Sequence, residues 1–176
     1  MLLEQLKSEE TRRSAFGVLA QRYGERLYWH IRKIVLVHDD ADDVLQNTFI
    51  RAWENISKFR GDSQLFTWLF RIATNESITF LNSTRRLQRL SAGDARQLLA
   101  NLRATDSHFC ANEAQERLQA AILTLPERQR MVFNMRYFDE MTYEQISEIL
   151  GVSVGALKAS YHFAEQKLKK YLGVDG

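Results

Sequence analysis

Apolar residues recur every third or fourth position along most of this 176-residue chain, and this spacing limits the folds open to it. In the segment from about residue 11 to residue 37 the recurring positions are Phe16, Leu19, Tyr23, Leu27, Ile31 and Ile34. Such spacing gathers the apolar side chains on one face of a helix. The chain lacks β-branched alternation and is rich in residues that favour helix, such as Leu, Ala, Glu and Arg. The sequence therefore predicts an all-α fold.

Turn signals separate three predicted helices in the first half of the chain. The acidic run at 38–43 interrupts the first helix, and Asp40 is predicted to cap the second, whose apolar stripe continues to Ile56. Gly61 marks a turn, and the third helix is expected from about residue 65 to residue 83 or somewhat beyond. These helices are long enough to pack into a single module.

The second half of the chain is organised differently. Residues 85–112 carry no sustained apolar stripe and are predicted to be a linker, within which 95–103 could form a short helix. Four helices are predicted after it, and Pro126, the sole proline, fits an early position of one of them because proline disrupts a helix interior. The sequence thus predicts two small helical domains, 1–84 and 113–176, joined by the linker.

Composition excludes several classes of protein. The chain is 45% hydrophobic and 26% charged, which is typical of globular proteins. It has no run of about 18 apolar residues and no secretory h-region, so we expect a cytoplasmic protein without membrane insertion. A single cysteine, Cys110, rules out an internal disulfide. With His108 beside it and no obvious further ligands, neither a metal site nor a cofactor is expected.

Charge is distributed unevenly along the chain. The net charge of +2 is only a weak argument for nucleic acid, since proteins that bind phosphates usually show a clear basic surplus. The surplus lies in the predicted linker, which contains five basic residues and two acidic ones. Its basic residues are Arg85, Arg86, Arg89, Arg96 and Arg103.

The stretch MTYEQISEILGVSVGALKAS, residues 141–160, has the pattern of a helix-turn-helix. Thr142 and Gln145 form a capping-box pair, Gly151 suits the positive φ of a tight turn, and Ser153 can cap the next helix. The second helix of such a motif enters the major groove of DNA, whereas in a plain helical hairpin its outer face would only be solvated. The outward positions predicted to contact DNA are Gly155, Ala156, Lys158, Ala159, His162 and Phe163.

Two patterns in the first domain have more than one interpretation. The acidic start of the second helix, 39–43, is favourable at any helix N-terminus and so is not by itself functional. The stretch FRGDSQLFTWLFRIATNES, residues 59–77, threads four rings with two arginines and a turn. Its rings fit either a hydrophobic core or a surface that stacks unpaired bases. Helical spacing favours the core for Leu69, Phe70, Ile72, Ala73 and Phe80 and leaves Trp68 open.

Three segments together resemble a known family. DADDVLQNTFIRAW, FRGDSQLFTWLFRIATN and LPERQRMVFNMRYFDEMTYEQISEILGVSVGALKAS resemble, in this order, the second and fourth conserved domains of the RNA polymerase sigma-70 family, in its short extracytoplasmic-function type. The resemblance implies a bacterial sigma factor that binds core RNA polymerase, recognises the −10 and −35 promoter elements and assists promoter melting. It implies no room for the third domain of larger sigma factors.

The resemblance also implies roles for individual residues. Those implied to dock on the clamp helices of the largest polymerase subunit are Asp42, Asp43, Gln46 and Asn47. Those implied to hold an extruded base of the −10 element and its flanking DNA are Phe59, Arg60, Asp62, Ser63, Phe66, Thr67, Arg71 and Asn75. The outward positions of the last helix would read the −35 element. The flap of the second-largest subunit and an anti-sigma factor are further implied partners.

The sequence departs from the family pattern in two places. Recognition helices of relatives commonly carry arginines where this chain has Ser160, Phe163 and Glu165, so its −35 contacts are expected to be fewer or different in kind. The linker is often acidic in relatives and is basic here.

Two other classes of function are weighed against the resemblance. An enzyme is disfavoured, because the GDS at 61–63 lacks the strand-turn-helix context of a nucleophile elbow. A stand-alone helix-turn-helix regulator would explain the C-terminal pattern. It would not explain the acidic helix and the aromatic turn that precede it.

Overall fold

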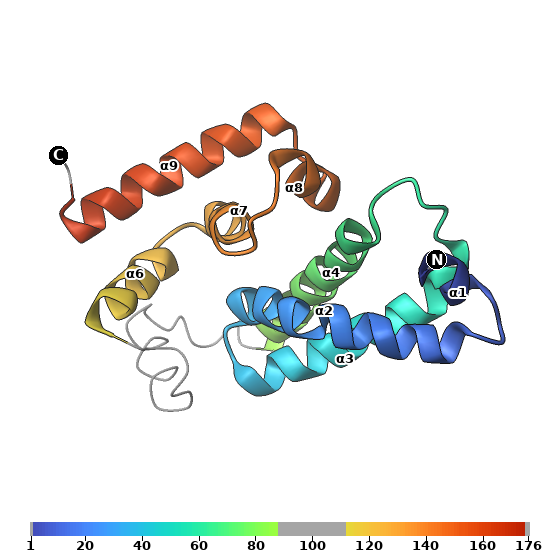
Figure 1. Cartoon of the computed structure of the whole chain (residues 1–176). Helices are drawn as coiled ribbons and strands as arrows, with labels where there is room; N and C mark the ends of the chain where they lie inside the picture. Colours follow the sequence, from blue (N-terminus) through green and yellow to red (C-terminus); the bar gives the residue numbers. More distant parts are fainter. Residues whose placement is uncertain (1, 88–111, 175–176) are drawn as a thin grey trace. The chain divides into compact units, whose positions relative to one another are not determined.

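The computed structural model describes residues 2–87 and 112–174 (Figure 1). The chain divides into two compact units, residues 1–85 and residues 86–176, called here the N-terminal and C-terminal units. Every regular element of the described residues is a helix, so the predicted all-α class is confirmed. No helix among these residues is sufficiently long and apolar to cross a membrane.

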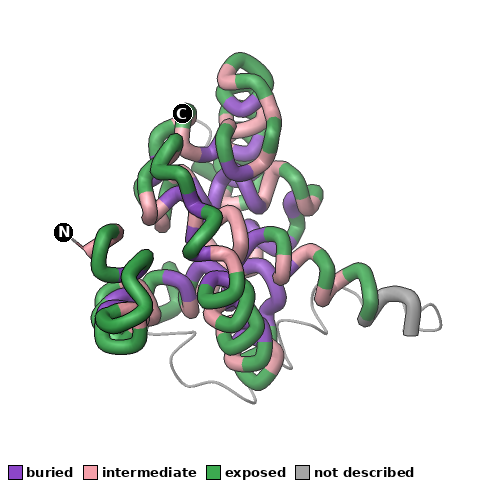
Figure 2. The backbone as a smooth tube through the Cα atoms, turned by 90° about the vertical axis from the view of Figure 1, so that its right-hand side faces the viewer, coloured by how far each residue is buried: buried purple, intermediate pink, exposed green. Residues whose placement is uncertain are grey.

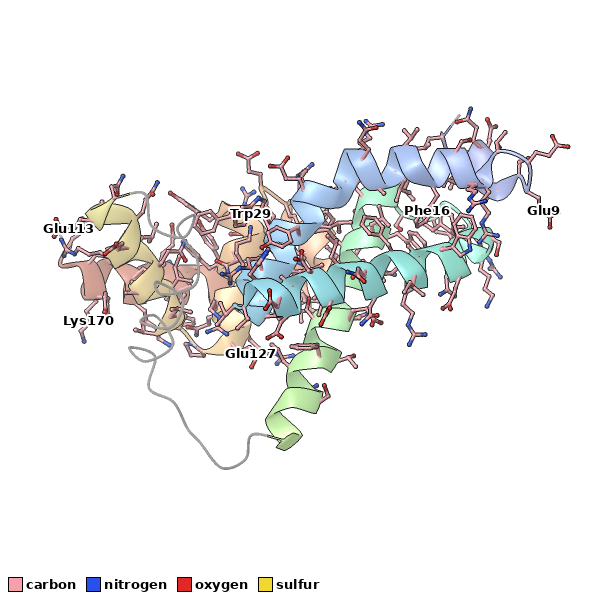
Figure 3. All side chains as sticks on the ribbon, turned by 90° about the horizontal axis from the view of Figure 1, so that it is seen from below. Glu9, Phe16, Trp29, Glu113, Glu127 and Lys170 are labelled. Atoms are coloured by element: carbon pink, nitrogen blue, oxygen red, sulfur yellow. The ribbon has the colours of Figure 1, made fainter. Side chains whose placement is uncertain are left out.

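The N-terminal unit is built on a hairpin of two long helices that α4 crosses (Figure 1). Buried residues lie where its helices face one another, as Figure 2 shows. Phe16 points from the first long helix toward the second (Figure 3), where its ring meets Phe49 and Trp53 edge-on with centroids 6.0 and 5.2 Å away. The elements of the unit are α1 (Leu2–Lys7), α2 (Arg12–Val35), α3 (His38–Asn55), the 3-10 helix η1 (Ile56–Lys58) and α4 (Leu65–Leu87).

The turn between α2 and α3 corrects one prediction. Leu36 adopts a left-handed conformation with φ of 70°, and its N–H donates to the Arg32 carbonyl. The chain reverses there, so α3 begins at His38 with Val37 as its N-cap residue and no side-chain cap. Asp40 was predicted to cap this helix. It lies within the first turn instead.

Helix α1 was not predicted from the sequence. It is only six residues long, and its Leu6 is fully buried while α1 packs against α2 and η1. Arg12, at the start of α2, donates to the backbone carbonyl of Trp53 and places its guanidinium 4.4 Å from the centroid of that ring. These contacts join the beginning of the chain to the end of α3.

A buried polar contact joins α2 to α4. The Nε2 atom of His30 lies 2.8 Å from the Thr74 hydroxyl oxygen, and both side chains are buried. Because the Thr74 hydroxyl donates its one hydrogen to the Phe70 carbonyl at 2.7 Å, it accepts from His30. The two helices are therefore fixed in register where they cross.

The described part of the C-terminal unit is a bundle of three short helices followed by one long helix. Pro126 directly precedes the second of them as its N-cap residue, in accord with the predicted early position. A buried cluster that includes Ile122, Phe133 and Leu168 holds the unit together. The elements are α6 (Glu113–Leu123), α7 (Glu127–Tyr137), α8 (Tyr143–Leu150) and α9 (Val154–Leu172).

Helices α8 and α9 form the predicted helix-turn-helix. The Thr142 hydroxyl accepts from the Gln145 N–H while the Gln145 side chain accepts from the Thr142 N–H, so the capping box is complete. Gly151 ends α8 with φ of 67°, and the Ser153 hydroxyl accepts from the Ala156 N–H at 3.3 Å. All three local predictions are confirmed.

The structure describes only the two ends of the predicted linker, residues 85–87 and 112. Helix α4 ends at Leu87, somewhat beyond residue 83 as the prediction allowed. The expected short helix at 95–103, together with His108 and Cys110, lies outside the described residues.

Candidate nucleic-acid interface

A pocket opens between η1, the loop that follows it and the first turns of α4. Its volume is about 510 Å³. Gly61 turns the loop with φ of 85°, a conformation that side chains other than glycine rarely adopt. The residues that line the pocket are Asn55, Lys58, Phe59, Arg60, Asp62, Ser63, Trp68, Arg71 and Ile72.

Two rings build one wall of the pocket. Phe59 is only 7% exposed, and its ring centroid lies 5.0 Å from that of Trp68. Trp68 is half-buried, so part of its ring is held by Phe59 while part remains accessible. An aromatic surface fixed in this way provides a stacking platform for a base.

Cationic side chains surround this wall. Lys58 and Arg60 are exposed, Arg71 is half-buried, and Asp62 is the acidic residue among the lining side chains. The Nε atom of Arg71 is buried and makes no hydrogen bond to any described residue. Three cations against one carboxylate favour an anionic ligand such as a phosphodiester.

The structure brings five of the eight residues predicted for −10 DNA into the pocket: Phe59, Arg60, Asp62, Ser63 and Arg71. The remaining three lie elsewhere on α4.

Those three residues have different surroundings. Thr67 is 1% exposed and belongs to the interior of the unit. Phe66 packs against Phe70, with centroids 4.2 Å apart, and against Tyr23 of α2 at 6.4 Å. Asn75 is exposed one turn beyond Arg71, on the same side of α4.

Sequence reasoning missed four lining residues or left them undecided. Trp68, Arg71 and Ile72 follow the i, i+3, i+4 spacing of one helix face, which was the available signal for Trp68 and Ile72. Asn55 is the last residue of α3, and Lys58 is brought to the pocket by η1, a single 3-10 turn without a sequence period of its own.

The polar side of α3 forms a second candidate surface. Asp43, Gln46 and Asn47 are exposed, and Asp42 is half-buried with an oxygen 3.6 Å from the Nε2 atom of His38. Their spacing of i, i+1, i+4 and i+5 places them side by side on the helix. The surface therefore offers carboxylate and amide groups together to a partner.

The outer face of α9 forms a third. All six residues predicted there are exposed, and Phe163 is 52% exposed. The ammonium of Lys158 lies 5.8 Å from the Tyr143 ring, and the Nε2 atoms of His162 and Gln166 are 3.0 Å apart. The opposite face carries the predicted stripe, in which Leu157, Ala164 and Leu168 are buried and Tyr161 is half-buried.

Comparison with known proteins identifies the family. Residues 19–87 match sigma-70 region 2, and residues 115–168 match sigma-70 region 4. The chain is 30% identical over 166 residues to the ECF RNA polymerase sigma factor SigW of Bacillus subtilis. The matched region covers 90% of this chain and 89% of SigW. The chain belongs to the ECF sigma factors. It thus directs RNA polymerase to promoters, and it is an initiation factor and not an enzyme.

Other relatives of this ECF sigma factor agree with the assignment. It is 29% identical over 162 residues to the ECF sigma-E factor of Escherichia coli, covering 88% of this chain and 84% of that one. The solved structure of CnrH with the cytosolic domain of CnrY is 26% identical with a TM-score of 0.72, covering 99% of this chain and 97% of that chain. Sigma factor RpoE of Bartonella quintana, solved with the anti-sigma factor NepR, shares the fold at 21% identity and a TM-score of 0.71, over 92% of this chain and 98% of that chain.

Proposed function

We propose that this sigma factor assists promoter melting by holding an extruded base of the −10 element in the pocket between η1 and α4. The observation that carries the proposal is the wall of the pocket, where Trp68 is backed by Phe59 beside Arg60 and Arg71. A flipped base needs an aromatic or apolar wall for stacking and cations for the flanking phosphates. The volume lies within the range of about 300 to 1,000 Å³ that is usual for ligand pockets.

Polar residues around the pocket supply groups for the edge of the base. Asp62 and Ser63 line the pocket, and the Asn75 amide is exposed one turn away from Arg71. Phe66 and Thr67 support the first turn of α4, because Phe66 packs on α2 and Thr67 is buried. Polymerase performs the chemistry. Binding favours the open strand, with each stacked base contributing roughly 1 to 3 kcal/mol.

The other two surfaces have separate roles in this proposal. The polar side of α3, with Asp42, Asp43, Gln46 and Asn47, docks on the clamp helices of the largest polymerase subunit. The outer face of α9 reads the −35 element in the major groove, where Lys158 is the one cation among its six predicted residues. The C-terminal unit also contacts the flap of the second-largest subunit.

Location and regulation follow from the same assignment. A sigma factor meets polymerase in the cytoplasm, so we place this chain there. CnrH, at 26% identity, is solved with the cytosolic domain of CnrY. By analogy we expect an anti-sigma factor to hold this chain until a signal releases it.

Two sets of variants test whether DNA opening and core binding depend on separate surfaces. With core polymerase and a cognate promoter, Asn75→Ala is expected to weaken promoter opening and leave core binding intact. Asp43→Ala with Gln46→Ala is expected to lose core binding, measured by a pull-down, while DNA recognition by the outer face of α9 is unchanged. The matched control is Asn82→Ala, an exposed asparagine further along α4.

Two outcomes would reject this account. If the wild-type chain fails to bind core polymerase but binds a DNA site alone, it acts as a stand-alone regulator. If a correctly folded Asn75→Ala variant loses core binding and opening together, the assignment of Asn75 to DNA is wrong.

A further inference from the structure

The lining of the pocket carries a surplus of positive charge. Lys58, Arg60 and Arg71 are set against one carboxylate, that of Asp62, which leaves two positive charges uncompensated. None of these four side chains forms an ion pair with another described residue. A phosphodiester carries one negative charge, whereas the phosphate monoester of a free nucleotide carries about −1.5 to −2 at neutral pH. The surplus therefore matches one terminal phosphate as closely as it matches the two phosphodiesters that flank a base in a strand.

Arg71 is placed to bind such a phosphate. Its side chain is half-buried, lines the pocket and makes no hydrogen bond to any described residue, although a guanidinium carries five N–H donors. The fork of donors on a guanidinium matches the oxygen atoms of a phosphate, and charge-assisted hydrogen bonds of this kind are stronger than neutral ones. A ligand with a phosphate would therefore pair donors that the described part of the chain leaves unpaired.

The remaining lining suits an adenine base. Trp68, backed by Phe59 at 5.0 Å between ring centroids, provides the face on which a base stacks. The Nδ2 atom of Asn55 donates to the Arg51 carbonyl at 2.8 Å, so the amide oxygen of Asn55 remains able to accept a hydrogen bond. Adenine offers an exocyclic amino group as the donor and, as a purine, a larger face for stacking than a pyrimidine. The pocket volume of about 510 Å³ lies in the range usual for small ligands.

We propose that the pocket also binds a free adenine nucleotide, and that this nucleotide competes with the extruded base of the −10 element. The inference rests on the proposed function of the pocket, because competition requires the base and the nucleotide to share Trp68. A bound nucleotide would hinder promoter opening and leave core binding by the polar side of α3 unchanged. Initiation by this sigma factor would then respond to the concentration of adenine nucleotides.

Binding of a free nucleotide is measured first, by equilibrium dialysis of the full chain against labelled AMP and labelled adenosine. AMP is expected to bind more tightly than adenosine, because adenosine lacks the phosphate. The affinity for AMP is expected to rise as the pH increases through about 6, where a phosphate monoester acquires its second negative charge. The affinity for adenosine should stay constant over the same range, since no histidine lines the pocket.

Two tryptophan variants locate the base. Trp68→Ala is expected to weaken the binding of AMP and adenosine alike by roughly 5- to 150-fold, through the loss of one stacking contact. The matched control is Trp29→Ala, at a residue of α2 that is 38% exposed and does not line the pocket (Figure 3). This variant should bind both ligands as the wild type does.

Two pairs of charge variants locate the phosphate. Lys58→Ala with Arg60→Ala is expected to lower the preference for AMP over adenosine by about tenfold, because charge-assisted hydrogen bonds to the phosphate are lost. Lys7→Ala with Arg13→Ala removes two exposed cations outside the pocket and should leave this preference unchanged.

Competition is then measured with holoenzyme on a forked probe that presents the −10 element as a single strand. AMP is expected to weaken probe binding by the factor that its concentration and its dissociation constant from dialysis predict. A lack of competition, or AMP binding that Trp68→Ala does not weaken, would overturn the inference.

The inference and the proposed function fail in different ways. If Trp68→Ala impairs promoter opening and the wild type shows no saturable binding of AMP, the inference is wrong and the proposed function stands. If Trp68→Ala weakens AMP binding but leaves promoter opening unchanged, the result supports the nucleotide site and rejects the proposed function.

Discussion

Asp40 shows how a single carboxyl group is affected by its position. Burial raises its pKa above the ordinary value of 3.8, and the nearby Asp43 and Asp39 raise it further. A carboxylate in the first turn of a helix is normally favourable, but here the opposing effects are larger. The charged form is therefore disfavoured in the folded state. These three aspartates lie in the same acidic segment as the surface proposed to bind polymerase.

Replacing this carboxyl group is expected to stabilise the protein at neutral pH. Because the pKa of Asp40 is raised in the folded state, ionising this carboxyl group costs folding free energy. The contribution of Asp40 to stability is therefore fully present below pH 3.8 and is lost as the pH rises through the folded pKa. Asp40→Asn should raise the melting temperature of the N-terminal unit at neutral pH, and the gain should shrink as the pH falls toward 3.8.

The matched control is Glu9→Gln, at an exposed carboxyl group that points away from the helices (Figure 3). It should change the melting temperature little. A gain for Asp40→Asn that does not depend on pH would contradict the explanation.

The sequence predicted the residue roles that depend on near neighbours in the chain. Gly151 and Ser153 were predicted correctly because their roles depend on neighbours within three residues. Trp68 could not be assigned, because its place in the pocket depends on Phe59 and on the path of the loop. Thr67 was predicted at the DNA site, but it is 1% exposed and does not line the pocket, although it lies one turn before Arg71.

Helix α1 is the element that supports the pocket loop. The Leu3 Cδ2 atom lies 3.7 Å from the position of a Cβ atom at Gly61, within the loop. Leu6, one turn further on, is fully buried, and α1 packs on η1, which supplies Lys58 to the pocket. The region 2 match begins at residue 19, so α1 lies outside it. A short helix at the start of the chain thus fixes one side of the site.

Truncating the buried leucine of α1 tests this support. Leu6→Ala is expected to lower the free energy of unfolding of the N-terminal unit by about 2 to 5 kcal/mol, the usual cost of a large cavity-creating substitution. Val18→Ala, at a residue that is 53% exposed, should change it by no more than about 0.5 kcal/mol. Denaturant unfolding of the full chain measures both. Equal effects would show that α1 does not contribute to the packing of the unit.

Helices with several turns were predictable from periodicity, and shorter elements were not. The spacing located α2, α3, α4 and α9, because each buries residues at helical spacing on one face. Helix α7 differs, since the five consecutive residues Met131 to Met135 are all buried. Six residues in α1 and three in η1 are too few to show a period. The start of α3 was misplaced for another reason, since the left-handed Leu36 carries no glycine signal.

At the scale of the whole molecule, the proposed recognition surfaces are divided between two units. The N-terminal unit carries the pocket and the polar side of α3, and the C-terminal unit carries the helix-turn-helix. The family resemblance gave this division before the structure did, because it depended on three ordered motifs. The resemblance also placed an extruded base at the loop, but it did not indicate that Asn55, Lys58 and Ile72 line the pocket, since the pocket arises where η1, the loop and α4 meet.

The most direct test of the central claim couples the pocket to the base that it is proposed to hold. Open-complex formation is measured for the wild type and Trp68→Ala, each on a promoter with an intact −10 element and on one with an abasic site at the extruded position. If Trp68 stacks on that base, the two changes are not additive, and the coupling free energy should be roughly 1 to 3 kcal/mol. An abasic site at another −10 position serves as the control and should show no coupling. Additive effects at every position would contradict the claim that this pocket holds an unpaired base.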